Sequence, residues 1–291
     1  MDAVTPAPLR IGSSEHKELL CRFFVQTHDP YKAADLTWPA LTDDAVARLK
    51  ALPIWEEAVR TEAETALAVL TMGAAEKDPE LSHAITLQGQ EEARHAEILR
   101  LLTRNYGITV PPYEATRPAD PDWAFMRIGY GECFDSFFAF GLFALARDSG
   151  FFPQPLVDLF EPIMQEEGRH ILFHVNWVAY NQARLPYAGR PGYVFRRGLA
   201  MWLQALSRLR TASRVKAAAD RDQDNFTMKA HAQFGDVSPR EFVELCLREN
   251  ERRLASYDPR LLRPQFVPSV ARAALAAMPR RDAPNPRPLP Q

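Results

Sequence analysis

The chain has 291 residues, of which 46% are hydrophobic, and a formal net charge of −2 at pH 7. This length suits one large domain or two small ones with a substantial apolar core, and the near-neutral charge gives no overall case for nucleic-acid binding. Three widely spaced cysteines without a C-x-x-C pair indicate neither a disulfide framework nor a thiolate metal site. Residues 1–10 lack an apolar signal core and the longest apolar run is 137–146, so we expect no membrane span and a cytoplasmic protein.

The hydrophobic periodicity predicts an all-α protein. Thr42 is expected to cap a short helix, and Asp78 followed by Pro79 marks a tight turn and the start of another helix. The long helix before residue 184 begins at Pro153 or Pro155, and we expect Pro162 to kink or restart it. In chain order, the predicted helices are 15–26, 42–50, 53–77, 79–106, 119–149, 155–184, 193–219, 226–233, 239–251 and 268–277.

The pattern Glu-Glu-x-Arg-His occurs twice, at 91–95 and at 166–170. Residues three apart project from nearly the same face of an α-helix. Glu92 and His95 can therefore hold one metal ion together, and Glu167 and His170 can hold another. Two copies indicate a two-metal site with internal pseudo-symmetry, provided that each copy has a partner helix with a carboxylate.

Each copy is preceded by a helix that offers such a carboxylate. In the first of these helices, Glu62 lies on an apolar stripe, whereas Glu64 lies on a wetter one, so we expect Glu62 to point inward. In the second, Glu132 and Asp135 are one turn apart and periodicity does not separate them cleanly. Spacing along the chain favours Glu132 as the ligand, with Asp135 beside the ligands.

Burial of four carboxylates calls for compensating positive charge. Glu62, Glu92, Glu132 and Glu167 would bring four negative charges into apolar surroundings, which is prohibitively costly without partners. Two divalent cations would neutralise them, with His95 and His170 as neutral imidazole ligands. Carboxylates with imidazole suit iron or manganese, so we expect two iron ions or a Mn/Fe pair.

Four helices carrying Glu, Glu-x-x-His, Glu and Glu-x-x-His resemble the ferritin-like di-iron carboxylate superfamily. The longer pattern resembles its oxygen-activating branch of bacterial monooxygenases, acyl-carrier desaturases and ribonucleotide reductase small subunits. The resemblance implies a ferritin-like four-helix bundle at 53–183. It would follow an N-terminal extension at 1–52 and precede C-terminal helices at 184–278 and a proline-rich, disordered tail at 279–291.

The resemblance also assigns roles to residues around the ligands. The acidic residue before each ligand glutamate would hydrogen-bond the ligand histidine of the other half, which casts Glu91 and Glu166 as orienting residues. Arg94 and Arg169 would complete the same buried polar network. His174 returns to the Glu167 stripe, and we expect it to be a buried histidine with a hydrogen-bond partner; metal ligation by His174 is the alternative.

These features predict a non-haem di-iron oxygenase or oxidase that uses O₂ to oxidise a small, largely apolar organic substrate. Because no flavin, haem or iron–sulfur motif is visible, electrons would come from an external donor such as a ferredoxin or a flavoprotein reductase. Small residues and the phenylalanines of 119–149 would wall an apolar chamber; these are Phe134, Phe137, Phe138, Phe140 and Phe143. The alternatives are a ferroxidase or iron-handling protein and a radical-generating subunit for a partner enzyme.

The stretch from Arg184 to Lys216 contains eight basic residues and no acidic one. It would suit an acidic redox protein or acyl-carrier partner. The alternative is a solvated helix face whose charge is balanced by acidic residues elsewhere. The resemblance adds a homodimer to the expected partners.

Overall fold

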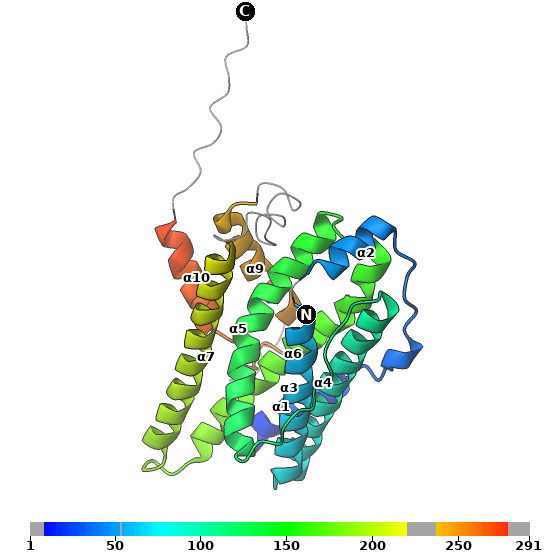
Figure 1. Cartoon of the computed structure of the whole chain (residues 1–291). Helices are drawn as coiled ribbons and strands as arrows, with labels where there is room; N and C mark the ends of the chain where they lie inside the picture. Colours follow the sequence, from blue (N-terminus) through cyan, green and yellow to red (C-terminus); the bar gives the residue numbers. More distant parts are fainter. Residues whose placement is uncertain (1–8, 53, 220–236, 279–291) are drawn as a thin grey trace, which may run out of the picture.

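The computed structural model describes residues 9–52, 54–219 and 237–278, which are all-helical and contain no strand. Predictions for 226–233 and 279–291 lie outside these residues, and the division into four domains stays a prediction. Helices α1 to α10 are drawn in Figure 1. Their bounds are α1 Ser14–Gln26, α2 Asp43–Lys50, α3 Trp55–Ala75, α4 Pro79–Asn105, α5 Pro121–Asp148, α6 Gln154–Arg184, α7 Arg190–Ala219, α9 Pro239–Leu254 and α10 Phe266–Ala277, with a short 3₁₀ helix, η1, at Ala33–Asp35.

Side-chain caps fix the starts of several helices. Thr42 accepts a hydrogen bond from the backbone N–H of Ala45 at the start of α2, and Asp78 accepts two at the start of α4, as the sequence predicts. Pro162 lies inside α6, which begins at Gln154 and continues to Arg184, so the helix does not restart at Pro162.

Helices α3 and α4 form the most tightly packed hairpin of the four long helices. A Cβ added to Gly73 would lie 2.5 Å from Thr86 Oγ1, and one added to Gly89 would lie 2.7 Å from Leu70 Cγ. Larger residues at these two glycines would push the helices apart. The two glycines therefore set how closely the helix of Glu62 approaches the helix of Glu92 and His95.

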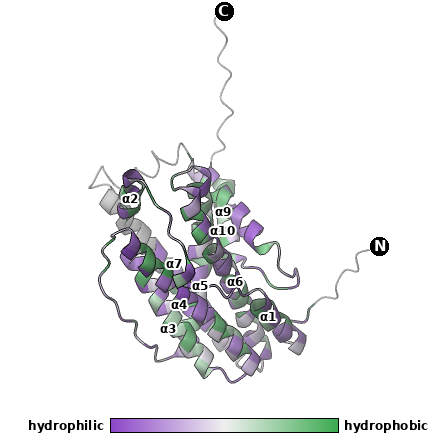
Figure 2. Cartoon of the chain, turned by 90° about the vertical axis from the view of Figure 1, so that its right-hand side faces the viewer, coloured by the Kyte–Doolittle hydropathy of each residue, from purple (hydrophilic) through white to green (hydrophobic). Residues whose placement is uncertain are grey.

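Helices α5 and α6 form a second hairpin, and the segment 106–120 crosses from α4 to α5. The four long helices α3, α4, α5 and α6 lie side by side as a four-helix core (Figure 1). Helix α1 packs against α4 and α6, where Leu20 and Phe24 are fully buried in the largest apolar cluster. Figure 2 shows hydrophobic and hydrophilic stretches alternating along the helices, as amphipathic helices require.

The C-terminal helices cover the outer side of α5. Helices α7, α9 and α10 all contact it. Phe137 packs with Cys246 and Leu247 of α9, the Phe134 ring stacks edge-on with Phe266, and Phe138 is 41% exposed. The prediction that the α5 phenylalanines wall an inner chamber is therefore wrong for these three, because the C-terminal helices use that face of α5.

Helix α5 is also the one described helix that is long and apolar enough to cross a membrane by length and composition. Half of its most apolar window is buried inside the protein, and the helix carries Glu132 toward the other helices of the core. Such burial is consistent with the core helix of a soluble protein. All three cysteines are buried and free, in keeping with the packing role expected for Cys133.

Gly129 on α5 leaves the space that His174 on α6 occupies. A Cβ at residue 129 would lie 1.9 Å from His174 Nδ1. We expect Gly129→Ala to lower the free energy of unfolding by about 1–3 kcal/mol, the usual cost of overpacking a core, and His174→Ala to restore part of it in the double variant. Urea denaturation followed by circular dichroism measures both effects.

Gly168→Ala is the matched control. Its Cβ would meet only Arg253 and Leu254 at 3.7 Å and 3.9 Å, which are ordinary contacts. Replacing a helical glycine by alanine without a clash stabilises a protein by about 1 kcal/mol. Equal effects of the two substitutions would contradict the packing of His174 against Gly129.

Candidate metal centre

The four-helix core brings the six predicted ligands together at its centre. The structure forms two groups whose potential ligand atoms lie within 4.8 Å of one another. Each group can hold a metal ion. The first group consists of Glu62, Glu92, His95 and Glu167, and the second of Glu92, Glu132 and His170. Glu92 belongs to both groups, so its two oxygens can bridge two ions.

Both histidines present the same ring nitrogen to the carboxylates. His170 Nδ1 lies 2.8 Å from Glu92 Oε1. His95 Nδ1 lies 3.6 Å from Glu92 Oε2, 3.4 Å from Glu167 Oε1 and 3.8 Å from Glu62 Oε2. The Nδ1 atoms therefore face the shared centre, and the Nε2 atoms point away from it.

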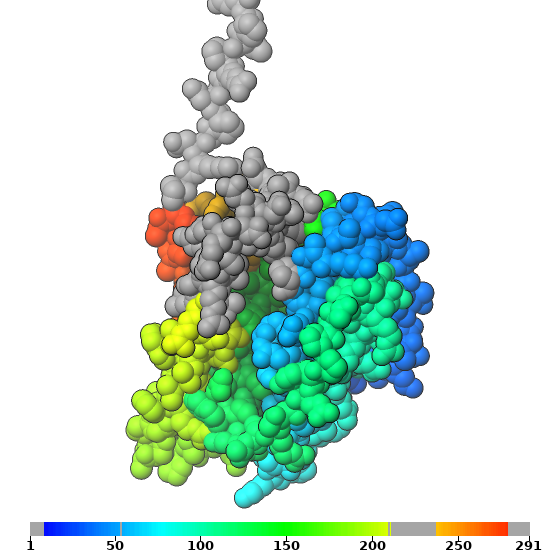
Figure 3. Space-filling model, in the orientation of Figure 1, coloured from blue at the N-terminus to red at the C-terminus, as the bar shows by residue number. Residues whose placement is uncertain are grey.

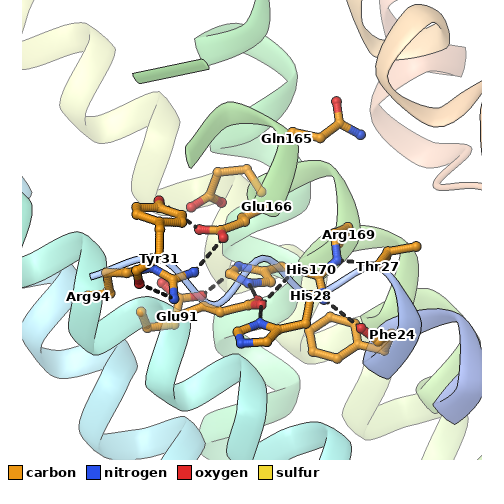
Figure 4. Close-up of polar contacts among 12 residues, drawn as sticks. Phe24, Thr27, His28, Tyr31, Glu91, Arg94, Gln165, Glu166, Arg169 and His170 are labelled. Atoms are coloured by element: carbon orange, nitrogen blue, oxygen red, sulfur yellow. Dashed lines mark hydrogen bonds and ion pairs between the residues drawn. The ribbon is translucent and has the colours of Figure 1, made fainter. Parts of the chain in front are cut away.

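The Nε2 atoms meet carboxylates from the opposite half of the sequence (Figure 4). His170 Nε2 lies 2.8 Å from Glu91 Oε2, and His95 Nε2 lies 2.8 Å from Glu166 Oε2. An Nε2–H that donates to a carboxylate leaves the Nδ1 lone pair free for a metal. Each Glu-Glu-x-Arg-His segment thus orients the histidine of the other, which is the contact that the family resemblance implies for Glu91 and Glu166.

The two arginines of the repeated pattern hold these orienting carboxylates. Arg169 Nη1 donates to Glu91 Oε1 at 2.7 Å, and Arg94 Nη2 donates to Glu166 Oε1 at 2.5 Å. Glu91 and Arg169 are almost completely buried. Burial disfavours the charged form of Glu91, yet the hydrogen bonds from His170 and Arg169 lower its pKa to about 2. Arg169, which is buried, and Arg94, which is partly buried, thus both contact the orienting carboxylates.

The segment after α1 adds partners that sequence reasoning missed. His28 Nδ1 lies 2.5 Å from Glu91 Oε1. Tyr31 donates its hydroxyl to Glu166 Oε2 at 3.3 Å. No periodic pattern marks either residue, because both lie in irregular chain between α1 and η1. The arginines reach the same segment: Arg169 donates to Thr27 Oγ1 and the Phe24 carbonyl, and Arg94 donates to the Tyr31 carbonyl.

The centre contains buried polar atoms that find no hydrogen-bond partner among the described residues. They are both carboxylate oxygens of Glu132, Glu92 Oε1, His95 Nδ1 and His170 Nδ1, of which Glu92 Oε1 and His170 Nδ1 face each other at 2.8 Å as an ion pair without hydrogen-bond geometry. Buried polar atoms are normally satisfied, and unpaired ones cost free energy. All five belong to the two ligand groups and are oxygen or imidazole nitrogen donors. The residues therefore fit divalent metal ions of the iron and manganese class.

The pKa values of these groups show how much the carboxylates crowd one another. Burial, together with the charges of Glu92 and Glu167, raises the pKa of Glu62 to about 8, and burial raises that of Glu132 well above its usual range. Burial also disfavours charge on Glu92, yet His170 and His95 lower its pKa. Against the same burial, the surrounding carboxylates raise the pKa of both histidines well above 6.5. Metal binding must therefore displace protons from this cluster.

The two ends of the cluster differ in access. The side chains of Glu92, His95 and His170 are at most 2% exposed, whereas Glu62 is 25% and Glu167 13% exposed. Ser136 on α5 also donates its hydroxyl to Glu167 Oε2 at 3.2 Å. Glu62 on α3 and Glu167 on α6 are therefore the more accessible side chains of the first ligand group.

Asp135 is not part of the centre. Its side chain is exposed and forms an ion pair with Arg208 of α7. Glu132 lies in the second group instead. The prediction that Asp135 lies beside the ligands is therefore wrong. Helices cover α5 on several sides, and its sequence is apolar on most of its faces, so the periodicity does not mark an inner face.

His174 is fully buried, but neither ring nitrogen has a hydrogen-bond partner among the described residues. It packs against the rings of Phe125, Tyr130 and Trp177 and belongs to neither ligand group. Burial lowers its pKa to about 3, so the imidazole is neutral. The expected hydrogen-bond partner for His174 is wrong; aromatic packing takes its place.

An apolar cavity of about 240 Å³ lies at one end of the four-helix core. Its walls continue the helix faces that carry the ligands: Ala58 is one turn from Glu62, and Leu99 is one turn from His95. Phe143 and Phe160 close it from α5 and α6. Phe143 is thus the one residue of the predicted phenylalanine wall that lines this cavity.

A second, polar cleft of about 810 Å³ lies on the outer side of α6. Glu166 and Arg169 line it together with Arg252 and Arg253 of α9. The cleft therefore reaches the residues that orient His95 and His170, but from the side opposite the ligand atoms.

Comparison with known proteins gives no match: no family model, no curated protein and no solved structure matches this chain. The assignment of these residues as a candidate metal centre therefore rests on the geometry of this chain alone.

Removing the orienting carboxylate should weaken metal binding without removing a ligand. We expect Glu91→Gln to lower the affinity for Fe(II) about 10–100-fold, because His170 loses a charged acceptor and Arg169 and His28 lose their shared partner. Anaerobic equilibrium dialysis with Fe(II) measures the change. Glu97→Gln on the exposed face of the same helix is the control and should bind like the wild type. Equal affinities of all three proteins would contradict the orienting role.

Proposed function

We propose that this chain is a ferritin-like di-iron carboxylate protein that uses O₂ to oxidise a small, apolar organic molecule, with electrons from an external donor. The observation that carries the proposal is the reciprocal arrangement at the centre. The two ligand groups share Glu92. In addition, the histidine of each Glu-Glu-x-Arg-His segment is hydrogen-bonded to the first glutamate of the other segment. Such a donor set is suited to two iron ions, or to a Mn/Fe pair.

The chain's own residues would divide the work of holding the metals. Glu62, His95 and Glu167 would hold one ion, Glu132 and His170 the other, and Glu92 lies where it can serve both. Two ferrous ions would supply electrons for the reduction of O₂. The buried contacts of Glu91 and Glu166 would keep the imidazoles in one orientation and tautomer throughout.

The apolar cavity supports an organic substrate. Every residue that lines it is apolar, and its nearest walls stand one helical turn from Glu62 and His95. Such a cavity favours a neutral hydrocarbon-like group and offers no partner for a charge or a hydrogen-bond donor. The substrate we propose is therefore a small aliphatic or aromatic molecule whose oxidised carbon or heteroatom points toward the carboxylates.

The electron balance requires a partner. Insertion of one oxygen atom of O₂ into a substrate reduces the other to water, which consumes two electrons and two protons beyond those of the substrate. We propose a ferredoxin or a flavoprotein reductase as the donor. We propose that protons enter through the polar cleft, which is lined in part by Glu166, whose Oε2 lies 2.8 Å from His95 Nε2.

A ferroxidase is the second candidate, and the partial exposure of Glu62 and Glu167 favours it. These carboxylates give Fe(II) a path into the centre from the α3 side. A ferroxidase would oxidise iron catalytically and release it, with no use for an apolar cavity.

Metal analysis after anaerobic loading tests the metal centre. We expect about two Fe(II) per wild-type chain and rapid O₂ consumption on mixing. Because Glu92 belongs to both groups, Glu92→Ala should lose both ions, whereas Glu132→Ala should lose only the ion beside His170. Glu64→Ala, on the exposed face of α3, is the control. Loss of one ion in Glu92→Ala, or of both in Glu132→Ala, would show that the groups are assigned wrongly.

Filling the cavity tests the substrate class. Leu99→Trp should narrow it, so that the wild type binds toluene and the variant binds it at least about tenfold more weakly, as isothermal titration calorimetry would show. Leu142→Trp, at a half-exposed position of α5, is the control and should leave toluene binding unchanged. A wild type that ignores apolar ligands yet oxidises Fe(II) catalytically would favour the ferroxidase.

A further inference from the structure

A further cavity, of about 280 Å³, lies where α5 and α6 meet α7 and the segment 262–267 that leads into α10; we call it the α7 cavity. Figures 1 and 3 show α7 at an outer edge of the molecule beside α5, and the two helices are in contact. The described residues that line the α7 cavity include none of the six candidate metal ligands and none of the residues that line the apolar cavity of about 240 Å³. It is therefore a separate place where a ligand can bind.

The walls of the α7 cavity are mainly apolar. Phe134 of α5 and Phe266 of α10 stack edge-on, with ring centroids 5.8 Å apart, and Val178 and Met201 line the cavity from α6 and α7. Phe266 is 49% exposed and Leu262, which also lines the cavity, is 38% exposed. An apolar ligand would remove these two side chains from water, which is favourable in proportion to the area covered.

Two arginines are the charged residues among the described residues that line the α7 cavity, and none of those residues is acidic. They are Arg197 of α7 and Arg263 of the segment before α10. Arg263 donates hydrogen bonds through Nη1 and Nη2 to four backbone carbonyls around the end of α9, so it contributes positive charge but few free donors. The cavity is therefore both apolar and positively charged.

Arg197 differs from Arg196 and Arg208 on the same helix. Arg196 pairs with carboxylates at the start of α5, and Arg208 pairs with Asp135. Arg197 donates to Gln182 Oε1 at 3.0 Å and forms no ion pair with a carboxylate of the described residues. A guanidinium has five N–H donors. Half-buried and without a carboxylate partner, Arg197 therefore has both charge and donors to offer a ligand.

The polar and apolar residues of the α7 cavity lie at different levels. The ion pairs between α7 and α5 follow the same order along both helices, which therefore run parallel. Burial raises the pKa of the Tyr130 hydroxyl to about 12, and the charge of Arg197 acts against that rise, so these two groups lie close together. Phe134 and Met201 lie one turn farther along the same two helices. The cavity thus has a polar end at Arg197 and the neutral Tyr130 hydroxyl, with an apolar end beyond it.

We propose that the α7 cavity binds a small amphiphilic carboxylate, with its carboxylate on Arg197 and its apolar part between Phe134, Met201 and Phe266. A guanidinium without a carboxylate partner can hold both oxygens of one carboxylate at once. A neutral molecule would leave Arg197 half-buried beside it without a charged partner, and a cation would be repelled. The inference does not rest on the proposed function, because the cavity shares no residue with the metal centre.

The volume of the α7 cavity limits the size of the ligand. About 280 Å³ equals the volume of roughly nine water molecules at ~30 Å³ each, so a molecule of roughly ten non-hydrogen atoms fills it. Octanoate and 3-phenylpropanoate have this size and carry an aliphatic and an aromatic apolar part. These two acids are the probes of the test.

Isothermal titration calorimetry of the full chain with the two acids, and with octan-1-ol and 3-phenylpropan-1-ol, tests the site. We expect the wild type to bind at least one acid at least about tenfold more tightly than the alcohol of the same carbon skeleton, because charged hydrogen bonds add to the apolar contacts. Arg197→Gln should erase this preference. Arg196→Gln, the same change at the neighbouring position, is the control and should bind like the wild type, since it removes only an exposed ion pair.

Two further variants locate the ligand. Met201→Trp fills the α7 cavity and should weaken the binding of acid and alcohol together, whereas Leu99→Trp, in the other apolar cavity, should bind the acid like the wild type. Unchanged circular dichroism would show that each variant folds. A wild type that binds neither acid at about 1 mM, equal affinities for acid and alcohol, or a preference that survives Arg197→Gln would overturn the proposal. Loss of acid binding in Leu99→Trp but not in Met201→Trp would place the acid in the other cavity and overturn it as well.

Discussion

The structure depends on two buried hydrogen-bonded pairs that cross between the halves of the sequence. Glu91 of α4 holds His170 of α6, and Glu166 of α6 holds His95 of α4, each at 2.8 Å. Neither half can orient its own histidine. Burying these carboxylates would be costly alone, and Arg169 and the partly buried Arg94 offset that cost through charged hydrogen bonds. These two pairs require α4 and α6 to face each other at the level of the two histidines, and this requirement constrains the arrangement of the four-helix core.

The two halves have similar motifs but different surroundings. The Glu62 side chain on α3 is 25% exposed, whereas both oxygens of Glu132 are buried and neither is hydrogen-bonded among the described residues. The cavity lies beyond Ala58 and Leu99 on the same helix faces. Under the proposed function, the partly exposed Glu62, the apolar cavity and the polar outer cleft would give separate approaches for metal, organic molecule and protons, as an oxidation that must keep water away from its substrate requires.

The parts of the site that can be predicted from the sequence are those that follow from helical periodicity and motif spacing. The inward position of Glu62 follows from an amphipathic stripe, and the pairing of Glu92 with His95 follows from their separation of three residues. The position predicted for Asp135 is wrong because helices cover α5 on several sides. Its sequence therefore has no polar face from which the inward side of the helix could be identified. His28 and Tyr31 were missed because they reach the centre through an irregular segment, and contacts of that kind have no signature in sequence. The ferritin-like classification remains part of the proposal.

The central claim is that two metal ions occupy the centre and share Glu92. Anomalous diffraction at the iron edge, from crystals of protein loaded anaerobically with Fe(II), tests it most directly. The account predicts two peaks about 3.5–4 Å apart, one beside Glu62 and His95 and the other beside Glu132 and His170, with Glu92 between them. A single peak, or iron bound away from Glu92, would contradict it.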